Sequence, residues 1–158
     1  MIDGVQIKKL KVIPDERGFL MQMLRNDEEI YGGFGQAYMT GVKRGVAKGW
    51  HYHLLQDDHF VCVLGKALVV LCDFRKDSPT YKEVQEFILT EPGQTGEQIL
   101  LKIPKGVLHG FAAHDCEEAR IVNIPTKEYN YKQPDELRYP WNSEEVPYTW
   151  PNDIKIGG

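Results

Sequence analysis

The sequence predicts an all-β domain built as a sandwich or a barrel. Short runs that are apolar, or that alternate between apolar and polar residues, recur along most of the chain, and Gly, Pro, Asn and Asp separate them. Many short strands at such regular spacing are typical of sandwiches and barrels. The 158 residues, 42% of them hydrophobic, fit a single domain, residues 1–158, with a core of ordinary size.

Eight runs are expected to form the strands. They cover residues 5–13, 36–42, 59–64, 67–74, 83–89, 97–103, 110–114 and 118–124. Only Gly65 and Lys66 separate the third run from the fourth, which predicts a hairpin at this point. Residues 25–34, RNDEEIYGGF, suggest one short peripheral helix with Asn26 as its N-cap.

The last 24 residues, DELRYPWNSEEVPYTWPNDIKIGG, differ from the rest of the chain. They are rich in Pro, Trp and Tyr but have no clear period. We expect their aromatic side chains to hold this tail across the barrel surface, without forming another sheet. Trp50, next to His51 in a strand, is expected to point to the opposite face and to pack there.

Charge and composition exclude several classes of protein. A formal net charge of −4 argues against a protein that coats nucleic acid. The N-terminus, MIDGVQIKKLKV, lacks the apolar segment of a signal peptide, and no apolar run reaches membrane-spanning length. Two of the three cysteines, Cys62 and Cys72, lie in apolar runs without metal-type spacing. We therefore expect a cytoplasmic protein with no nucleic-acid or membrane partner.

Two histidine-containing patterns interlock in the sequence. The first is Gly45, five residues, His51-x-His53, four residues, Asp58, six residues, Gly65, and the second is Pro104-x-Gly106-x-x-His109. They resemble the two motifs of the cupin β-barrel superfamily, which line the barrel interior and usually carry Glu in place of Asp58. Three imidazoles and a carboxylate are ligands that Fe(II), Mn(II), Ni(II) or Zn(II) accept. A polar cavity, in which these groups bond to one another and to water, is the alternative.

Four further segments favour a metal-free interpretation. They are DERGF (15–19), DFRKDSPTY (73–81), KIPKGVLHGF (102–111) and YPWNSEEVPYTWP (139–151). In this order they resemble the dTDP-4-dehydrorhamnose 3,5-epimerase family, a metal-independent branch of the cupins, over about residues 3 to 151. The resemblance implies a cupin jelly roll, a nucleotide-sugar substrate, an isomerase activity and a homodimer. No cofactor is favoured.

The resemblance also implies roles for individual residues. An epimerase of keto sugars removes a proton next to the ketone with a base and returns a proton to the opposite face from an acid. His51 falls on the family's catalytic base, and His109 falls on a second histidine that polarises the carbonyl or orients His51. Arg17 and Lys48 fall on arginines that could meet the diphosphate. Gln56 falls on the family's Q-x-K segment.

The family pattern also places aromatic residues beside the nucleotide. Tyr129 matches a tyrosine implicated in stacking on the base, and Tyr131 is close enough in sequence to take that role.

Three catalytic details depart from the family pattern. Asn123 stands where the family has its proton-donating tyrosine, and an amide can donate a hydrogen bond to an enolate but no titratable proton. The chain stops soon after Pro151, before the aspartate that orients the base histidine. His53 replaces a family glutamine, and apart from these three details Asp58 replaces a family lysine. A shift of the alignment by a few residues would make Tyr129 or Tyr131 the acid.

These departures argue against a double epimerisation at two carbons. We expect a sugar-nucleotide epimerase or isomerase of polysaccharide or deoxysugar biosynthesis that acts on a keto-deoxysugar through His51 and His109. His53 with Asp58 would then replace the missing histidine–aspartate dyad. Two alternatives remain from the sequence: a metal-dependent cupin enzyme that uses His51, His53, Asp58 and His109, and a sugar-nucleotide binding protein without catalysis.

Overall fold

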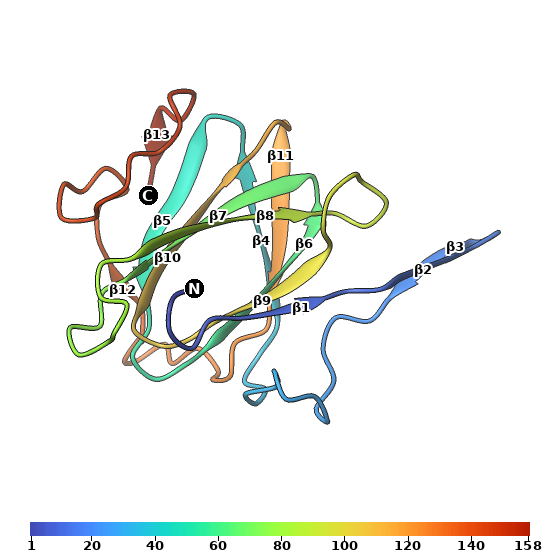
Figure 1. The fold of residues 1–158 in the computed structure, drawn as a ribbon, viewed down its shortest axis with the longest axis horizontal. Helices are drawn as coiled ribbons and strands as arrows, with labels where there is room; N and C mark the ends of the chain where they lie inside the picture. Colours follow the sequence, from blue (N-terminus) through green and yellow to red (C-terminus); the bar gives the residue numbers. More distant parts are fainter.

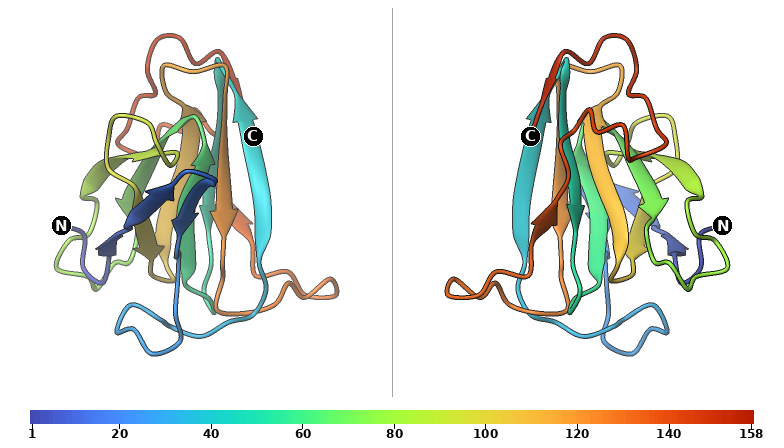
Figure 2. Two further views of the ribbon diagram at one scale, coloured as in Figure 1. Left: turned by 90° about the vertical axis from the view of Figure 1, so that its right-hand side faces the viewer. Right: turned by 90° about the vertical axis from the view of Figure 1, so that its left-hand side faces the viewer.

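The computed structural model describes residues 1–158 as two β-sheets packed face to face (Figures 1 and 2). The first sheet contains, in order across it, β1 (Gln6–Lys9), β9 (Ile99–Ile103), β6 (Asp58–Leu64), β11 (Glu118–Asn123) and β4 (Tyr38–Lys43). The second contains β12 (Leu137–Arg138), β5 (Val46–Tyr52), β10 (Val107–Ala113), β7 (Lys66–Asp73) and β8 (Val84–Thr90). This is the all-β jelly-roll sandwich that the sequence predicts.

Two short additions complete the sheets. Strand β13 (Ile156–Gly157) lies parallel to β5, whereas the other pairings are antiparallel. Strands β2 (Val12–Asp15) and β3 (Gly18–Met21) form a separate hairpin that extends away from the sandwich as an arm (Figure 1). No helix in the structure is long and apolar enough to cross a membrane.

The predicted helix and the predicted hairpin are both wrong. Residues 26–30 form turns and residues 31–34 are irregular, because hydrogen bonds such as Tyr31 N–H to the Glu28 carbonyl do not continue into a helix. At Gly65 the chain passes from β6 in one sheet to β7 in the other, so these strands are not paired. Gly65 has a φ of 69°, and a Cβ there would lie 2.3 Å from the Glu118 carbonyl oxygen. A tight glycine turn is thus compatible with a change of sheet as well as with a hairpin.

The main core lies between the two sheets. Its buried side chains include Val69 and Leu71 from β7, Leu101 from β9 and Ile121 from β11. On β10, Val107, Phe111 and Ala113 belong to this core, whereas Leu108 and Ala112 face the other side of the sheet. The period of two along β10 therefore directs His109 into the sandwich.

The aromatic tail covers the outer face of the second sheet, as the sequence predicts. Trp50 packs there against Trp150, with ring centroids 5.0 Å apart. The indole N–H groups of both tryptophans donate to the Trp141 carbonyl oxygen, at 3.1 Å and 3.0 Å. Val146 and Ile154 complete this cluster. These contacts fix the face of β5 that points away from the sandwich, and the opposite face of β5 points into the sandwich interior.

The motif DFRKDSPTY has a structural role at the end of β7. The buried Asp73 carboxylate accepts hydrogen bonds from Arg75 Nε at 2.8 Å, Ser78 Oγ at 2.5 Å and Thr80 Oγ1 at 2.7 Å. Burial raises the pKa of Asp73, but these donors outweigh it and hold the pKa well below its usual value. Arg75 is accordingly engaged by its own chain.

Candidate active site

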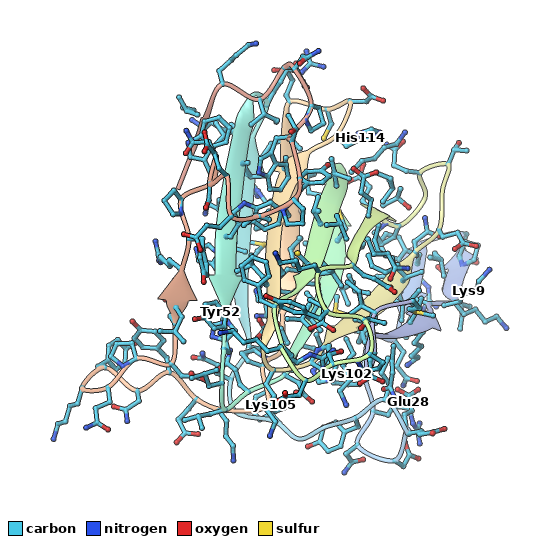
Figure 3. All side chains as sticks on the ribbon, turned by 60° about the vertical axis from the view of Figure 1, so that its left-hand side comes forward. Lys9, Glu28, Tyr52, Lys102, Lys105 and His114 are labelled. Carbon is cyan, nitrogen blue, oxygen red and sulfur yellow. The ribbon has the colours of Figure 1, made fainter.

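A cavity of about 940 Å³ opens between the sheets at one end of the sandwich. Its walls come from β4 and β6 on one side and from β5 and β10 on the other, and residues 127–138 form its rim. Figure 2 shows the loop after β11 extending beyond the sheets, and Figure 3 shows Tyr52 where β5 ends beside β12. The volume lies within the range that small-molecule sites occupy.

His51 faces this cavity from β5. It pairs in register with His109 on β10, and their ring centroids are 6.4 Å apart. Burial, together with the charges of His109 and Arg138, lowers the pKa of His51 to about 4. At neutral pH the imidazole is therefore neutral and can accept a proton.

Glu136 is the carboxylate nearest to His51. Its Oε1 lies 3.9 Å from His51 Nε2, and it also pairs with Arg138. The sequence instead suggested Asp58 as the partner of a catalytic imidazole. Asp58 contacts His53 and His109 instead, so Glu136 is the carboxylate that lies within 4 Å of His51, at a distance too long for a direct hydrogen bond.

A β-bulge brings Lys48 onto the same wall as His51. The register of β5 against β10 shifts between the pairs His109–His51 and Phe111–Lys48, so that one extra residue of β5 is accommodated. A Cβ on Gly110 would lie only 2.9 Å from the Lys48 carbonyl oxygen, so this close approach requires glycine. The ammonium group of Lys48 donates to Thr40 Oγ1 across the cavity at 3.0 Å.

His53, Asp58 and His109 form a buried cluster next to His51. Asp58 Oδ2 lies 3.3 Å from Nε2 of each histidine, and neither contact has hydrogen-bond geometry. Asp58 Oδ1 accepts a hydrogen bond from Gln56 Nε2 at 2.9 Å. The Asp58 side chain is 1% exposed, so its charge has no access to water.

The tautomers of the two histidines favour a positive charge within this cluster. His109 Nδ1 lies 3.1 Å from the Val107 carbonyl oxygen, and His53 Nδ1 faces that of Asp135. A carbonyl oxygen can only accept a hydrogen bond, so both Nδ1 atoms carry hydrogen. If both rings were neutral, their Nε2 atoms would direct lone pairs at the Asp58 carboxylate, and the two would repel each other. A proton on Nε2, or a bound cation, removes this repulsion.

The pKa directions agree with a shared proton. Burial lowers the pKa of His53, but the Asp58 carboxylate 3.3 Å away outweighs it and the net pKa is raised. Burial raises the pKa of Asp58, yet His109 and His53 hold it well below its usual value.

The same cluster contains three of the four metal ligands that the sequence suggested. The ligand atoms of His53, Asp58 and His109 lie within 4.8 Å of one another, whereas His51 does not belong to the group. Two imidazoles whose Nδ1–H groups are anchored on carbonyl oxygens, with one carboxylate, are chemically suited to a divalent cation.

Asn123 lies behind the cavity wall. Its side chain is fully buried on β11, opposite Tyr38 of β4, and it does not line the cavity. Asn123 Nδ2 donates to the Tyr38 hydroxyl at 2.9 Å, and its Oδ1 accepts the His59 backbone N–H at 3.0 Å. Any influence of Asn123 on a bound molecule therefore passes through Tyr38.

The predicted substrate contacts are distributed unevenly. Lys48, Gln56, Tyr129 and Tyr131 line the cavity, and the two tyrosine rings meet edge to face with centroids 4.9 Å apart. Arg17 does not reach the cavity of its own chain. It lies at the end of the β2–β3 arm, with its side chain 81% exposed and paired with Asp15 at 2.6 Å.

Among the cavity residues that sequence reasoning missed are Tyr38, Glu136 and Arg138. Tyr38 and Thr40 alternate in QAYMTGV, a signal that polar side chains share one face of that strand. Glu136 and Arg138 belong to the tail, where no period marks a face.

Comparison with known proteins relates the chain to sugar-nucleotide enzymes. The family model of dTDP-4-dehydrorhamnose 3,5-epimerase matches residues 1–157. The chain is 40% identical to spore coat polysaccharide biosynthesis protein SpsL of Bacillus subtilis, covering 98% of this chain and 100% of that protein. It is 37% identical to the probable low-salt glycan biosynthesis epimerase Agl13 of Haloferax volcanii, covering 97% of both. A dTDP sugar isomerase structure from Desulfovibrio desulfuricans has a TM-score of 0.86 at 32% identity, covering 94% of this chain and 92% of that one.

Proposed function

The chain belongs to the dTDP-4-dehydrorhamnose 3,5-epimerase family, and from this premise we propose that it epimerises or isomerises a keto-deoxysugar nucleotide. Proton transfer next to the ketone would be carried out by histidine. The names of its relatives in Bacillus subtilis and Haloferax volcanii support a place in polysaccharide or glycan biosynthesis.

The observation that carries this proposal is the neutral His51 in the cavity wall. A base must be unprotonated before it can remove the proton from the carbon next to the ketone, and His51 has a pKa of about 4. When that C–H bond breaks, its electron pair forms the enolate, whose negative charge falls on the former ketone oxygen. Lys48 lies on the same wall and would supply a positive charge to that oxygen, whereas both ring nitrogens of His109 face groups of the protein, the Val107 carbonyl and Asp58.

The nucleotide would occupy the cavity rim. Tyr129 and Tyr131 present aromatic edges and faces there, which suits stacking on a base. Lys48 is the cavity cation closest in sequence to His51 and suits an oxygen of the sugar or the diphosphate. Gln56 donates a hydrogen bond to Asp58 and would therefore keep that carboxylate in place. It also lines the cavity, where it would face the substrate.

We further propose that the protein is a cytoplasmic homodimer. The β2–β3 arm extends away from the sandwich (Figure 1). Its Phe19 and Leu20 side chains are about 60% exposed, and a second copy would cover them. In such a dimer Arg17 would contribute its charge to the cavity of the partner. This explains how Arg17 can contact the diphosphate although it lies outside the cavity of its own chain. Three free cysteines suit a reducing compartment.

Solvent deuterium exchange tests the proposed function. Wild-type protein in D₂O is expected to incorporate deuterium next to the ketone of a dTDP-4-keto-6-deoxysugar, detected by mass spectrometry and NMR. The dTDP-sugar without the ketone is the control, because its C–H bonds are not acidic and should not exchange. Binding of the keto sugar without any exchange would instead identify a non-catalytic sugar-nucleotide binding protein.

The cluster of His53, Asp58 and His109 supports a second candidate, a metal-dependent cupin enzyme. Under the favoured proposal, protein purified without a histidine tag should hold well below one equivalent of Fe, Mn, Ni or Zn. Exchange should also survive treatment with EDTA. One equivalent of metal, lost together with activity in EDTA and retained in His51→Asn, would establish the metal enzyme instead.

A further inference from the structure

An epimerase needs a proton donor on the face of the sugar opposite its base. If the base returned the proton itself, the original configuration would be restored. Asn123, at the position of the family's tyrosine, has no titratable proton to give, and it lies outside the cavity. The acid must therefore come from another residue, a conclusion that rests on the proposed function.

The two walls of the cavity belong to different sheets. His51 and His109 lie on the neighbouring strands β5 and β10 of the second sheet. Tyr38 and Thr40 from β4, and Phe60 from β6, line the cavity from the first sheet. Of these three, only Tyr38 carries a group that can titrate.

We propose that Tyr38 is the catalytic acid. His51 removes the proton from the carbon next to the ketone, and the electron pair of that bond forms the enolate. The enolate collapses to the ketone as a new C–H bond forms on the opposite face, with the proton of the Tyr38 hydroxyl. This leaves an imidazolium and a tyrosinate, and transfer of the proton between them through solvent restores both groups.

The hydrogen bonds of Asn123 orient the Tyr38 hydroxyl for this task. Because Asn123 Oδ1 accepts the His59 N–H, its Nδ2 is the atom that faces Tyr38, at 2.9 Å. The tyrosine oxygen is thus an acceptor in this bond, and its own hydrogen is free to point into the cavity. The same donor stabilises the negative charge that develops on the oxygen as the proton leaves.

The surroundings keep this proton in place until it is needed. Burial and the charge of Asp58 raise the pKa of Tyr38 to about 12, against the opposing effect of the Asn123 hydrogen bond. The phenol is therefore protonated at neutral pH.

Other candidates for the acid are less well placed. His109 shares the wall of the base, so its proton would arrive on the wrong face. Tyr131 is 88% exposed in the rim loop, where it contacts Tyr129.

The Tyr38→Phe variant separates proton removal from inversion. With a dTDP-4-keto-6-deoxysugar in D₂O, the variant should still exchange the proton next to the ketone with retention of configuration, because His51 is intact. Formation of the inverted product should fall by at least ~100-fold, the usual contribution of a general acid. Tyr81→Phe, an exposed tyrosine outside the cavity, is the matched control and should behave as wild type.

Two results would overturn the assignment. One is inversion at the wild-type rate in Tyr38→Phe. The other is an equal loss of exchange and inversion in a variant whose circular dichroism and melting temperature match the wild type. Absence of exchange in the wild type would instead overturn the proposed function, and the role of Tyr38 with it.

Asn123→Ala tests the positioning role of Asn123. If Asn123 acts through Tyr38, the ratio of inversion to exchange should fall. A purely structural role would lower both rates together and leave this ratio unchanged, which would contradict the positioning role.

Discussion

Replacing His51 by asparagine is expected to lower the rate of deuterium exchange by about 10²- to 10⁴-fold, because the cavity loses its neutral base. Binding of the nucleotide should change little, since the rim that would hold it is intact. Mass spectrometry of the substrate after incubation in D₂O measures exchange, and calorimetry measures binding. His114→Asn is the matched control, because His114 lies outside this cavity. Exchange at the wild-type rate in His51→Asn would show that another group is the base.

The pH dependence of the wild type provides a second measure of the same residue. A histidine with an ordinary pKa of 6.5 would lose base activity below neutrality, whereas His51 has a pKa of about 4. The exchange rate should therefore stay level from pH 8 down to about pH 5 and decline only as His51 becomes protonated near pH 4. A decline centred near pH 6.5 would contradict the effect of burial on His51.

Replacing Asp58 by asparagine is expected to lower the free energy of unfolding by about 3 to 5 kcal/mol. The amide preserves the shape of the side chain but leaves the positive charge of the histidine pair buried without its partner. Chemical denaturation monitored by circular dichroism measures the change. Asp115→Asn, with an 81% exposed side chain, should change stability by no more than about 0.5 kcal/mol. A loss below about 1 kcal/mol in Asp58→Asn would mean that the cluster is not charged.

Because of this cluster, the free energy of unfolding should also pass through a maximum as the pH is varied. The pKa of Asp58 is lowered from 3.8 in the folded state, so its contribution is present above about pH 4 and is lost as the pH falls. The pKa of His53 is raised from 6.5, so its contribution is present below about pH 6.5 and is lost as the pH rises through the raised pKa. The cluster therefore stabilises the fold most between these values, and Asp58→Asn should flatten this maximum.

Several features of the fold were predictable because they depend on short-range periodicity. Alternation along a strand placed His51 and His53 on one face and Trp50 on the other, and the structure confirms this arrangement. The aromatic tail was also predicted correctly, since large apolar side chains without a period have to pack on an existing surface.

The errors and omissions have a common origin in pairing between distant segments. Gly65 marks a tight turn in either a hairpin or a crossover, and only the partners of β6 and β7 distinguish the two. The bulge that brings Lys48 beside His51 arises from the register of β5 against β10. Tyr38 meets Asn123 because β4 pairs with β11, across 85 residues of chain.

The sequence by itself determined the all-β class, the histidines of the interior and the family resemblance, because these depend on residue type, spacing and order along the chain. Only the tertiary structure decided which groups act together. It joined Asp58 to His53 and His109 and left His51 neutral. It also placed Tyr38 on the wall opposite the base. The pKa and partners of a side chain are set by burial and by neighbours from other strands, and sequence spacing does not contain them.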